Sequence, residues 1–253
     1  MLMLTALLCG IPFVDDVPQE TKQDKVVQKD QQAASTSTSL TKTEAKPKVV
    51  KKVKKANMAT INLVKGPTRL NVRHWPSIGN PDAKYVFVEM FDYTCPHCRE
   101  THKAVDGAIK KFGKDLAIIC LPVPLDGKCN SMVQVTNAKH AEACEVSRIA
   151  IAVWRCKPSS FHKFHDWMFA APNARTAMAA RTFGEQLIGK ERLTAELGKP
   201  YASQYIASHV KLYKGAGAGQ VPKLMFPRSN VKGKIASANT LIQMIEQQFP
   251  AKR

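Results

Sequence analysis

One segment of the chain, residues 84–121, constrains the fold more than any other part of the sequence. Lys84–Phe91 is a dense run of β-branched and aromatic residues, which is typical of a strand buried on both faces. Pro96–Phe112 has helical composition and is followed by Gly113, a residue type that often ends helices. Asp115–Leu121 is a second apolar run. This order predicts a β-α-β unit with two parallel strands and a right-handed crossover.

The rest of the chain after this unit completes an α/β pattern without an internal repeat. Four segments of helical composition precede a glycine-rich break, and two short strands and a closing helix follow it. The helical segments are Ala138–Trp154, Phe161–Phe169, Ala177–Ile188 and Tyr201–Tyr213; the break is Gly215–Gly219, the strands are Lys223–Phe226 and Val231–Ile235, and the closing helix is Asn239–Phe249. We therefore expect one folded domain over residues 58–253.

The first 57 residues do not share this pattern. Residues 1–18 begin with the apolar stretch Met1–Val14, which is too short to cross a bilayer and lacks the positive residues of a secretory signal. Three interpretations remain open: a signal or anchor with a misplaced start, the end of a lost membrane segment, or a disordered apolar terminus. Residues 19–57 are polar and of low complexity, and we expect a disordered basic linker there.

The chain is strongly basic, with 38 Lys+Arg against 20 Asp+Glu and a formal net charge of +18. Seven lysines lie in the run Lys42–Lys55, which could bind an anionic membrane surface, although most such runs are solvated spacers. No zinc-finger spacing, aromatic RNA-binding signature or phosphate-binding loop occurs, so we expect no nucleic-acid partner. The apolar runs are all shorter than about 18 residues, which excludes a polytopic membrane protein.

The sequence Cys95-Pro96-His97-Cys98 lies where the first buried strand ends and the helix begins. At a helix N-terminus, unpaired backbone N–H groups and the positive end of the dipole stabilise an anion. We therefore expect Cys95 to be held as a thiolate, with a pKa lowered by roughly three units, or about 4 kcal/mol. Pro96 suits the first helical position, and His97 can add a hydrogen bond or a positive charge. Cys98, further into the helix, is placed to attack a mixed disulfide on Cys95.

Other chemistry for this pair is less well supported. A zinc site needs four ligands, and no second Cys-x-x-Cys occurs in the chain. Covalent haem attachment needs a histidine after the second cysteine, where Arg99 stands. Two soft thiolates can also bind copper(I), with Met90 as a further ligand, and this alternative remains open. A third alternative is that the pair is chemically inert. Redox catalysis is the interpretation that the spacing and position favour.

The stretch Asp92-Tyr93-Thr94-Cys95-Pro96-His97-Cys98-Arg99, after a buried strand, resembles the active site of DsbA-type thiol:disulfide oxidoreductases. It is especially similar to the bacterial thioredoxin-like domains associated with vitamin K epoxide reductase modules. The likeness runs from about Trp75 to the C-terminus. It implies an α/β thioredoxin fold with a central mixed β-sheet and an inserted helical subdomain at about residues 130–215.

The resemblance also implies roles for three further residues. Glu89 matches a buried carboxylate that helps to move a proton to or from Cys98. Val221 and Pro222, after the glycine-rich break, match the cis-proline loop that packs over the disulfide and binds substrate backbone. The other histidines of the helical region receive no role.

The remaining cysteines divide into those the resemblance explains and those it does not. The related domains imply a structural disulfide between Cys129 and Cys144, worth roughly 3 kcal/mol in the chain-entropy model. Cys120, inside an apolar strand, is expected to be an inert core thiol. Cys156 is either free or a partner for Cys120. Persistent disulfides favour an oxidising compartment.

Together these observations predict a disulfide oxidase that needs no cofactor and no metal. Its expected substrates are unfolded or reduced exported proteins, and its expected reoxidant is a membrane redox partner, of the vitamin K epoxide reductase type by resemblance. We expect it in the bacterial periplasm or cell envelope, with an N-terminal membrane anchor as one option. The alternatives are a disulfide reductase or isomerase, or a copper-binding thiol chaperone.

Overall fold

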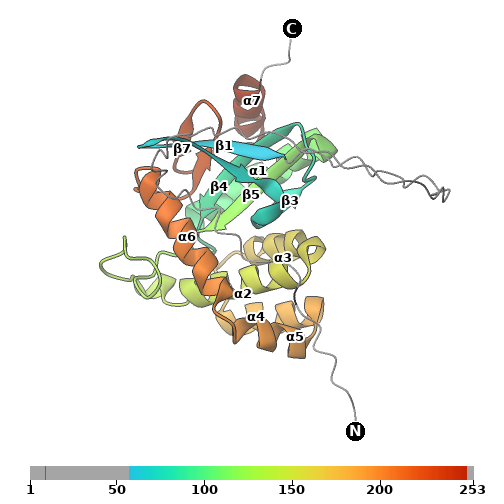
Figure 1. Ribbon diagram of the computed structural model, residues 1–253, viewed down its shortest axis with the longest axis vertical. Coiled ribbons are helices and arrows are strands. Elements are labelled where there is room, and N and C mark those ends of the chain that lie inside the picture. Colours follow the sequence, from blue (N-terminus) through green and yellow to red (C-terminus); the bar gives the residue numbers. More distant parts are fainter. Residues whose placement is uncertain (1–8, 10–56, 250–253) are drawn as a thin grey trace, which may run out of the picture. The chain divides into compact units, whose positions relative to one another are not determined.

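A five-stranded mixed sheet lies at the centre of the computed structural model, which describes Cys9 and residues 57–249 (Figure 1). The strand order is β3-β5-β4-β6-β7, and β4 and β5 are parallel while the other pairs are antiparallel. The strands span Ser77–Gly79 (β3), Tyr85–Phe91 (β4), Leu116–Pro122 (β5), Lys223–Met225 (β6) and Asn230–Lys232 (β7). Apart from Cys9, the predicted N-terminal segment and nearly all of the predicted linker lie outside the described residues.

The two central strands and the helix between them form the predicted β-α-β unit. Every residue of β5 is buried, and so is every residue of β4 after Tyr85. Two-faced burial explains the unbroken apolar runs of both segments. The helix α1 spans Pro96–Phe112, as predicted, and ends at Gly113, whose φ of +52° favours glycine.

The closing helix α7 (Ala238–Gln248) packs on α1. The two helices meet at Gly107, where an added Cβ would lie 2.3 Å from the Cβ of Ala238. Only a residue without a side chain allows this close approach. Helix α1 is therefore closely packed against α7, and it also contacts α3.

Five helices form an inserted subdomain between β5 and β6, which Figure 1 shows at the end of the sheet. They are α2 (Ala143–Cys156), α3 (Pro158–Ala170), α4 (Ala177–Ile188), α5 (Lys190–Leu197) and α6 (Tyr201–Gly215). Four of them were predicted, and α5 was not. A short hairpin, β1 (Met58–Leu63) with β2 (Gly66–Asn71), precedes the sheet and was also missed.

The insertion holds a disulfide that the sequence analysis did not foresee. Cys156, at the end of α2, is bonded to Cys9, so neither state predicted for Cys156 is correct. Cys120 is a free, buried thiol. Next to Cys156, the buried Arg155 donates to the buried Glu196 with an N–O distance of 2.5 Å, which ties α2 to α5.

Within the part of the chain that the structure describes, no helix combines the length and the apolar character needed to span a bilayer.

Candidate active site

Cys95 occupies the N-cap position of α1, directly after the loop that leaves β4. Its backbone N–H donates to the carbonyl of Asp92 (3.1 Å), and its own carbonyl accepts from the N–H of Arg99 (3.1 Å). Pro96 takes the first helical position, where its missing N–H costs no hydrogen bond. The backbone thus places the sulfur of Cys95 at the N-terminal end of the helix.

The two cysteines of the motif have opposite protonation preferences. The pKa of Cys95 is lowered to about 6, chiefly by a hydrogen bond from the Cys98 side chain and then by the backbone N–H groups of Cys98 and His97, against the effect of burial. Burial raises the pKa of Cys98 well above its usual range, and the contact with Cys95 adds to this. Both cysteines are free and buried in the structure. The arrangement provides one thiolate next to one thiol.

His97 contributes less than the sequence suggested. Its side chain is exposed, and its contribution to the Cys95 pKa comes through its backbone N–H. The largest effect comes instead from Cys98. From the sequence we expected the helix N-terminus and His97 to lower the Cys95 pKa, and this expectation left out the largest contribution, the hydrogen bond from Cys98.

Val221 lies against Cys95, although 126 residues separate the two along the chain. The Sγ of Cys95 is 3.9 Å from the carbonyl oxygen of Val221, and the Val221–Pro222 peptide bond is cis. The next residue, Lys223, holds this loop in place: its Nζ donates to the carbonyl oxygens of Ala216 (3.1 Å) and Ala218 (2.5 Å). The glycine-rich segment is thus fixed beside the redox pair.

Glu89 is buried in β4, with 1% of its surface exposed. Burial raises its pKa to about 7, and the charge of His102 opposes this effect. Neither carboxylate oxygen has a hydrogen-bond partner among the described residues, so Glu89 makes no direct bond to Cys98. A role in moving protons to or from Cys98 therefore requires an intermediary or a change in conformation.

Asp92 and His140 form a buried network at the motif that sequence reasoning missed. The N–H of Asp92 donates to Sγ of Cys98 (3.4 Å), and the Asp92 carboxylate accepts from the N–H and hydroxyl of Thr94 and from the N–H of Leu125. Thr94 Oγ1 also lies 2.6 Å from Nδ1 of His140. Because the hydroxyl proton goes to Asp92, Nδ1 of His140 is the donor in this contact. The sequence feature that could have indicated this network is Asp92 itself, an acid three residues before Cys95.

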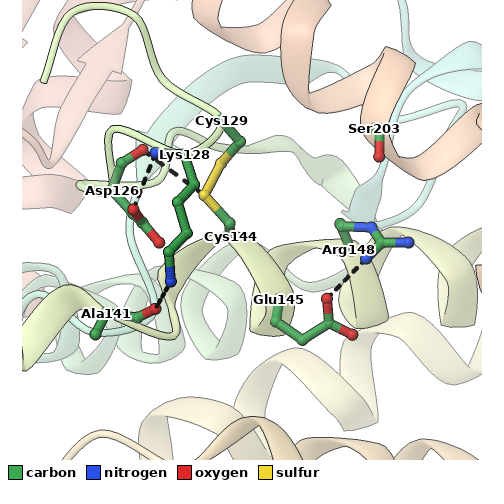
Figure 2. Close-up of a pocket in the computed structure, with 8 residues that line it drawn as sticks. All are labelled: Asp126, Lys128, Cys129, Ala141, Cys144, Glu145, Arg148 and Ser203. Atoms are coloured by element: carbon green, nitrogen blue, oxygen red, sulfur yellow. Dashed lines mark hydrogen bonds and ion pairs between the residues drawn. A yellow bond between two sulfur atoms is a disulfide. The ribbon is translucent and has the colours of Figure 1, made fainter.

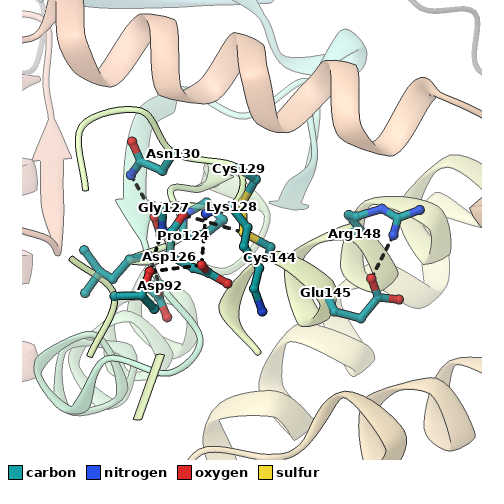
Figure 3. The surroundings of a disulfide bond; sticks show 12 residues. Asp92, Pro124, Asp126, Gly127, Lys128, Cys129, Asn130, Cys144, Glu145 and Arg148 are labelled. Carbon is teal, nitrogen blue, oxygen red and sulfur yellow. Dashed lines mark hydrogen bonds and ion pairs between the residues drawn. A yellow bond between two sulfur atoms is a disulfide. The ribbon is translucent and has the colours of Figure 1, made fainter. Parts of the chain in front are cut away.

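The same carboxylate connects the motif to a second cysteine pair. Cys129 and Cys144 form a disulfide with a sequence separation of 15, and Figure 3 shows Asp92 beside the loop that follows β5 and carries Cys129. Within that loop, Asp126 accepts from the N–H of Lys128 (3.0 Å), and Asn130 donates to the carbonyl of Pro124 (2.7 Å). A cavity of about 360 Å³ lies beside the disulfide, and Figure 2 labels the residues that line it. The hydrogen bond from Leu125 to Asp92 fixes one end of this loop, and the Cys129–Cys144 disulfide fixes the other.

A family model described as thioredoxin matches residues 71–245. This chain belongs to the thioredoxin family. The predicted fold, a central mixed sheet with an inserted helical subdomain, is confirmed. The match covers the β4–α1 motif, the insertion and the cis-proline loop.

Solved structures with the same fold are similar to this chain at low sequence identity. BdbD from Bacillus subtilis, in its oxidised form, has a TM-score of 0.58 and 19% identity, covering 76% of this chain and 99% of BdbD. The thiol-disulfide exchange protein alpha-DsbA2 from Wolbachia pipientis has a TM-score of 0.56 and 17% identity, covering 68% and 86%. A periplasmic thioredoxin-like protein from Salmonella enterica serovar Typhimurium has a TM-score of 0.55 and 19% identity, covering 70% and 90%. No match was found among the curated proteins.

Proposed function

We propose that this thioredoxin-family chain is a thiol–disulfide oxidoreductase that acts as an oxidase, introducing disulfides into exported proteins. The observation that carries the proposal is the contrast in pKa between Cys95, lowered to about 6, and Cys98, raised well above its usual range. At about pH 7, a cysteine with a pKa near 6 is roughly nine tenths thiolate. Interactions that stabilise this thiolate favour the reduced protein, and therefore make its disulfide a stronger oxidant.

The reaction begins with a substrate thiolate that attacks Sγ of Cys95 in the oxidised protein. The Cys95–Cys98 bond breaks, Cys98 leaves and takes up a proton, and a mixed disulfide joins the substrate to Cys95. A second substrate thiolate then attacks the substrate sulfur of this mixed disulfide. Cys95 leaves as a thiolate, and its low pKa makes it a good leaving group. The substrate has lost two electrons and the Cys95–Cys98 pair has gained them.

The surrounding residues support this reaction in the roles proposed for them. Val221 and Pro222 would bind the substrate backbone, because the Val221 carbonyl lies against the reactive sulfur. Glu89 would exchange protons with Cys98 through an intermediary, and His97 would contact substrate from its exposed position. Cys129 and Cys144 would hold the loop that donates to Asp92.

We assign the protein to the bacterial envelope, where disulfides persist. This assignment is supported by the similarity to a periplasmic thioredoxin-like protein and by the Cys9–Cys156 and Cys129–Cys144 disulfides of the chain itself. A membrane redox partner, of the vitamin K epoxide reductase type, would reoxidise the Cys95–Cys98 pair. Unfolded or reduced exported proteins would be its substrates.

The Cys95 pKa is the first quantity to measure. The rate of alkylation of Cys95 should rise with pH through about 6 and then level off, because the thiolate is the nucleophile. An ordinary cysteine would show this rise near about 8.5. A Cys95 pKa near that ordinary value would overturn the oxidase proposal.

The direction of the reaction needs a second experiment. The equilibrium with glutathione gives the reduction potential, and two assays compare the directions: oxidation of a reduced, unfolded ribonuclease and reduction of insulin. An oxidase should oxidise ribonuclease efficiently and reduce insulin poorly. Efficient insulin reduction together with a potential near that of thioredoxin, about −270 mV, would favour the reductase alternative instead.

A further inference from the structure

Two packed helices place a set of nitrogen and oxygen ligands next to each other, one turn beyond the redox motif. Helix α1 contributes His102 and Asp106, and helix α3 contributes His162 and Asp166. On each helix the histidine precedes the aspartate by four residues, so both side chains lie on the same face. The two pairs face one another across the contact between α1 and α3.

The separations between these ligand atoms fit the coordination shell of a small divalent cation. Nε2 of His102 lies 3.4 Å from Oδ1 of Asp106 and 3.3 Å from Oδ1 of Asp166. All three ligand atoms lie within 4.8 Å of one another. Bonds from Zn²⁺ to such ligands are about 2.0–2.1 Å long, and a tetrahedron with these bonds has edges of about 3.3–3.4 Å. Both nitrogen–oxygen distances match such an edge.

These atoms lie within ion-pair distance of one another but make no hydrogen bonds of good geometry. His102 is 4% exposed, and neither of its ring nitrogens has a hydrogen-bond partner within residues 57–249. The same holds for the buried Oδ1 of Asp166. A buried polar atom without a partner costs about 1–3 kcal/mol. Without a metal, the contacts that hold these atoms together are the ion pairs of the His102 ring with Asp106 and Asp166, which lack hydrogen-bond geometry.

We propose that His102, Asp106 and Asp166 form a binding site for a divalent cation of the zinc class. Three protein ligands leave one position of a tetrahedral site open. That position faces a surface cavity of about 350 Å³, which these residues help to line. His162 positions Asp166, since its Nε2 lies 3.3 Å from Oδ2, the oxygen that does not face His102.

The charges around the cluster permit such a site. Arg99, Lys103 and Lys110 line the same cavity. Lys103 and Lys110 are exposed, so water and salt screen their repulsion of a cation. The Nη1 of Arg99 donates to the carbonyl oxygen of Pro172 (3.3 Å), while its buried Nε and Nη2 have no hydrogen-bond partner among the described residues. The two aspartates supply the negative charge in direct contact with the ion.

The test uses the full chain with Cys95 and Cys98 oxidised to a disulfide, so that these thiols cannot bind metal. Calorimetry with Zn²⁺ should show one site, and Co²⁺ should give the visible bands of tetrahedral coordination without a thiolate charge-transfer band. Asp106→Asn should weaken Zn²⁺ binding by at least about 100-fold, and His162→Gln by about 10- to 100-fold, the range for residues that orient a ligand. Asp106 is half-exposed, so the first variant leaves the core intact.

Glu100→Gln is the matched control, because it removes the same charge from the same helix at an exposed residue that pairs with Lys234. This variant should bind Zn²⁺ as the unmodified protein does. Binding that disappears when the dithiol is oxidised, or that survives in Asp106→Asn and Asp166→Asn, would overturn the proposal. So would equal weakening in Glu100→Gln. None of these results depends on the redox activity.

Discussion

The two cysteine pairs around Asp92 have opposite chemistry within the same small region. Cys95 and Cys98 are three residues apart at the start of a helix, and both are free thiols in the structure. Cys129 and Cys144 are 15 residues apart, one in a loop and the other on α2, and they are joined. Both pairs are held near the carboxylate of Asp92 and its hydrogen-bonded loop. The comparison shows that the surroundings of each sulfur, and not the mere presence of a pair, distinguish the two pairs.

The physical difference lies in which redox state the fold stabilises. Around Cys95, the Cys98 thiol and two backbone N–H groups stabilise a thiolate, which is present only after reduction. The sulfur of Cys144 lies 3.6 Å from the carbonyl oxygen of Asp126, and Sγ of Cys95 has a similar contact with Val221 (3.9 Å), so this contact does not distinguish the two pairs. The bond between Cys129 and Cys144 also closes a loop and so restricts the unfolded chain. One pair is arranged for exchange, and the other for stability.

The largest effect should come from removing the outer sulfur of the redox pair. Cys95→Ala should lower the rate of thiol–disulfide exchange by at least about 1,000-fold, because it removes the nucleophile and leaving group. The midpoint of denaturation should change little. Cys120→Ala is the matched control, since Cys120 is also a buried free thiol. Full activity in Cys95→Ala, or an equal loss in Cys120→Ala, would contradict the role given to Cys95.

Removing the second cysteine pair should lower the stability of the protein and leave its exchange activity intact. Replacing both Cys129 and Cys144 with alanine should lower the free energy of unfolding by about 3 kcal/mol, the value for a loop of about 15 residues. Chemical denaturation followed by tryptophan fluorescence measures this loss. Exchange activity per folded molecule should persist. A double variant that keeps its stability but loses exchange would show that this pair takes part in the redox reaction.

A third change tests the source of the low Cys95 pKa. Cys98→Ala removes the largest stabilising contact of the thiolate, so the Cys95 pKa should rise from about 6 by at least about one unit, or about 1.4 kcal/mol. The same variant should accumulate the mixed disulfide with substrate. The pH dependence of alkylation gives the pKa, and mass spectrometry detects the adduct. An unchanged pKa would mean that the helix N-terminus alone stabilises the thiolate.

The strands and helices around the redox pair could be predicted because their signals are local. Two-faced burial gives apolar runs in β4 and β5, and the helix between them begins at Pro96 and ends before Gly113. The three-residue strand β3 could not be predicted from so short a run. It depends on Gly79, whose φ is +85° and whose added Cβ would lie 2.2 Å from the carbonyl oxygen of Leu116.

The contacts that complete the site could not be predicted because they connect distant parts of the chain. His140 reaches Thr94 across 46 residues, and the Cys9–Cys156 disulfide spans 147. Nothing in the local sequence of either residue specifies its partner. For Glu89, burial could be inferred from its strand. Its lack of any hydrogen-bond partner in the described chain could not be inferred in this way.

The smallest expected effect concerns Asp92, which joins the two cysteine regions. When ionised, its carboxylate repels negative charge and raises the pKa of both Cys95 and Cys98. Asp92→Asn should therefore lower the Cys95 pKa, by less than about one unit because repulsion is the smallest of the contributions. The amide oxygen can still accept the Leu125 N–H. The disulfide of this variant should be a slightly stronger oxidant in equilibrium with glutathione.

Asp126→Asn separates this electrostatic effect from simple loosening of the loop. Asp126 is also a buried acid, and it accepts from the Lys128 N–H and the Thr136 hydroxyl in the loop between β5 and α2. If charge at Asp92 is what acts on Cys95, then Asp126→Asn should leave the Cys95 pKa unchanged. Equal shifts in the two variants would instead mean that the loop sets the Cys95 pKa through its position. The two cysteine pairs would then be coupled mechanically, and not through the charge of Asp92.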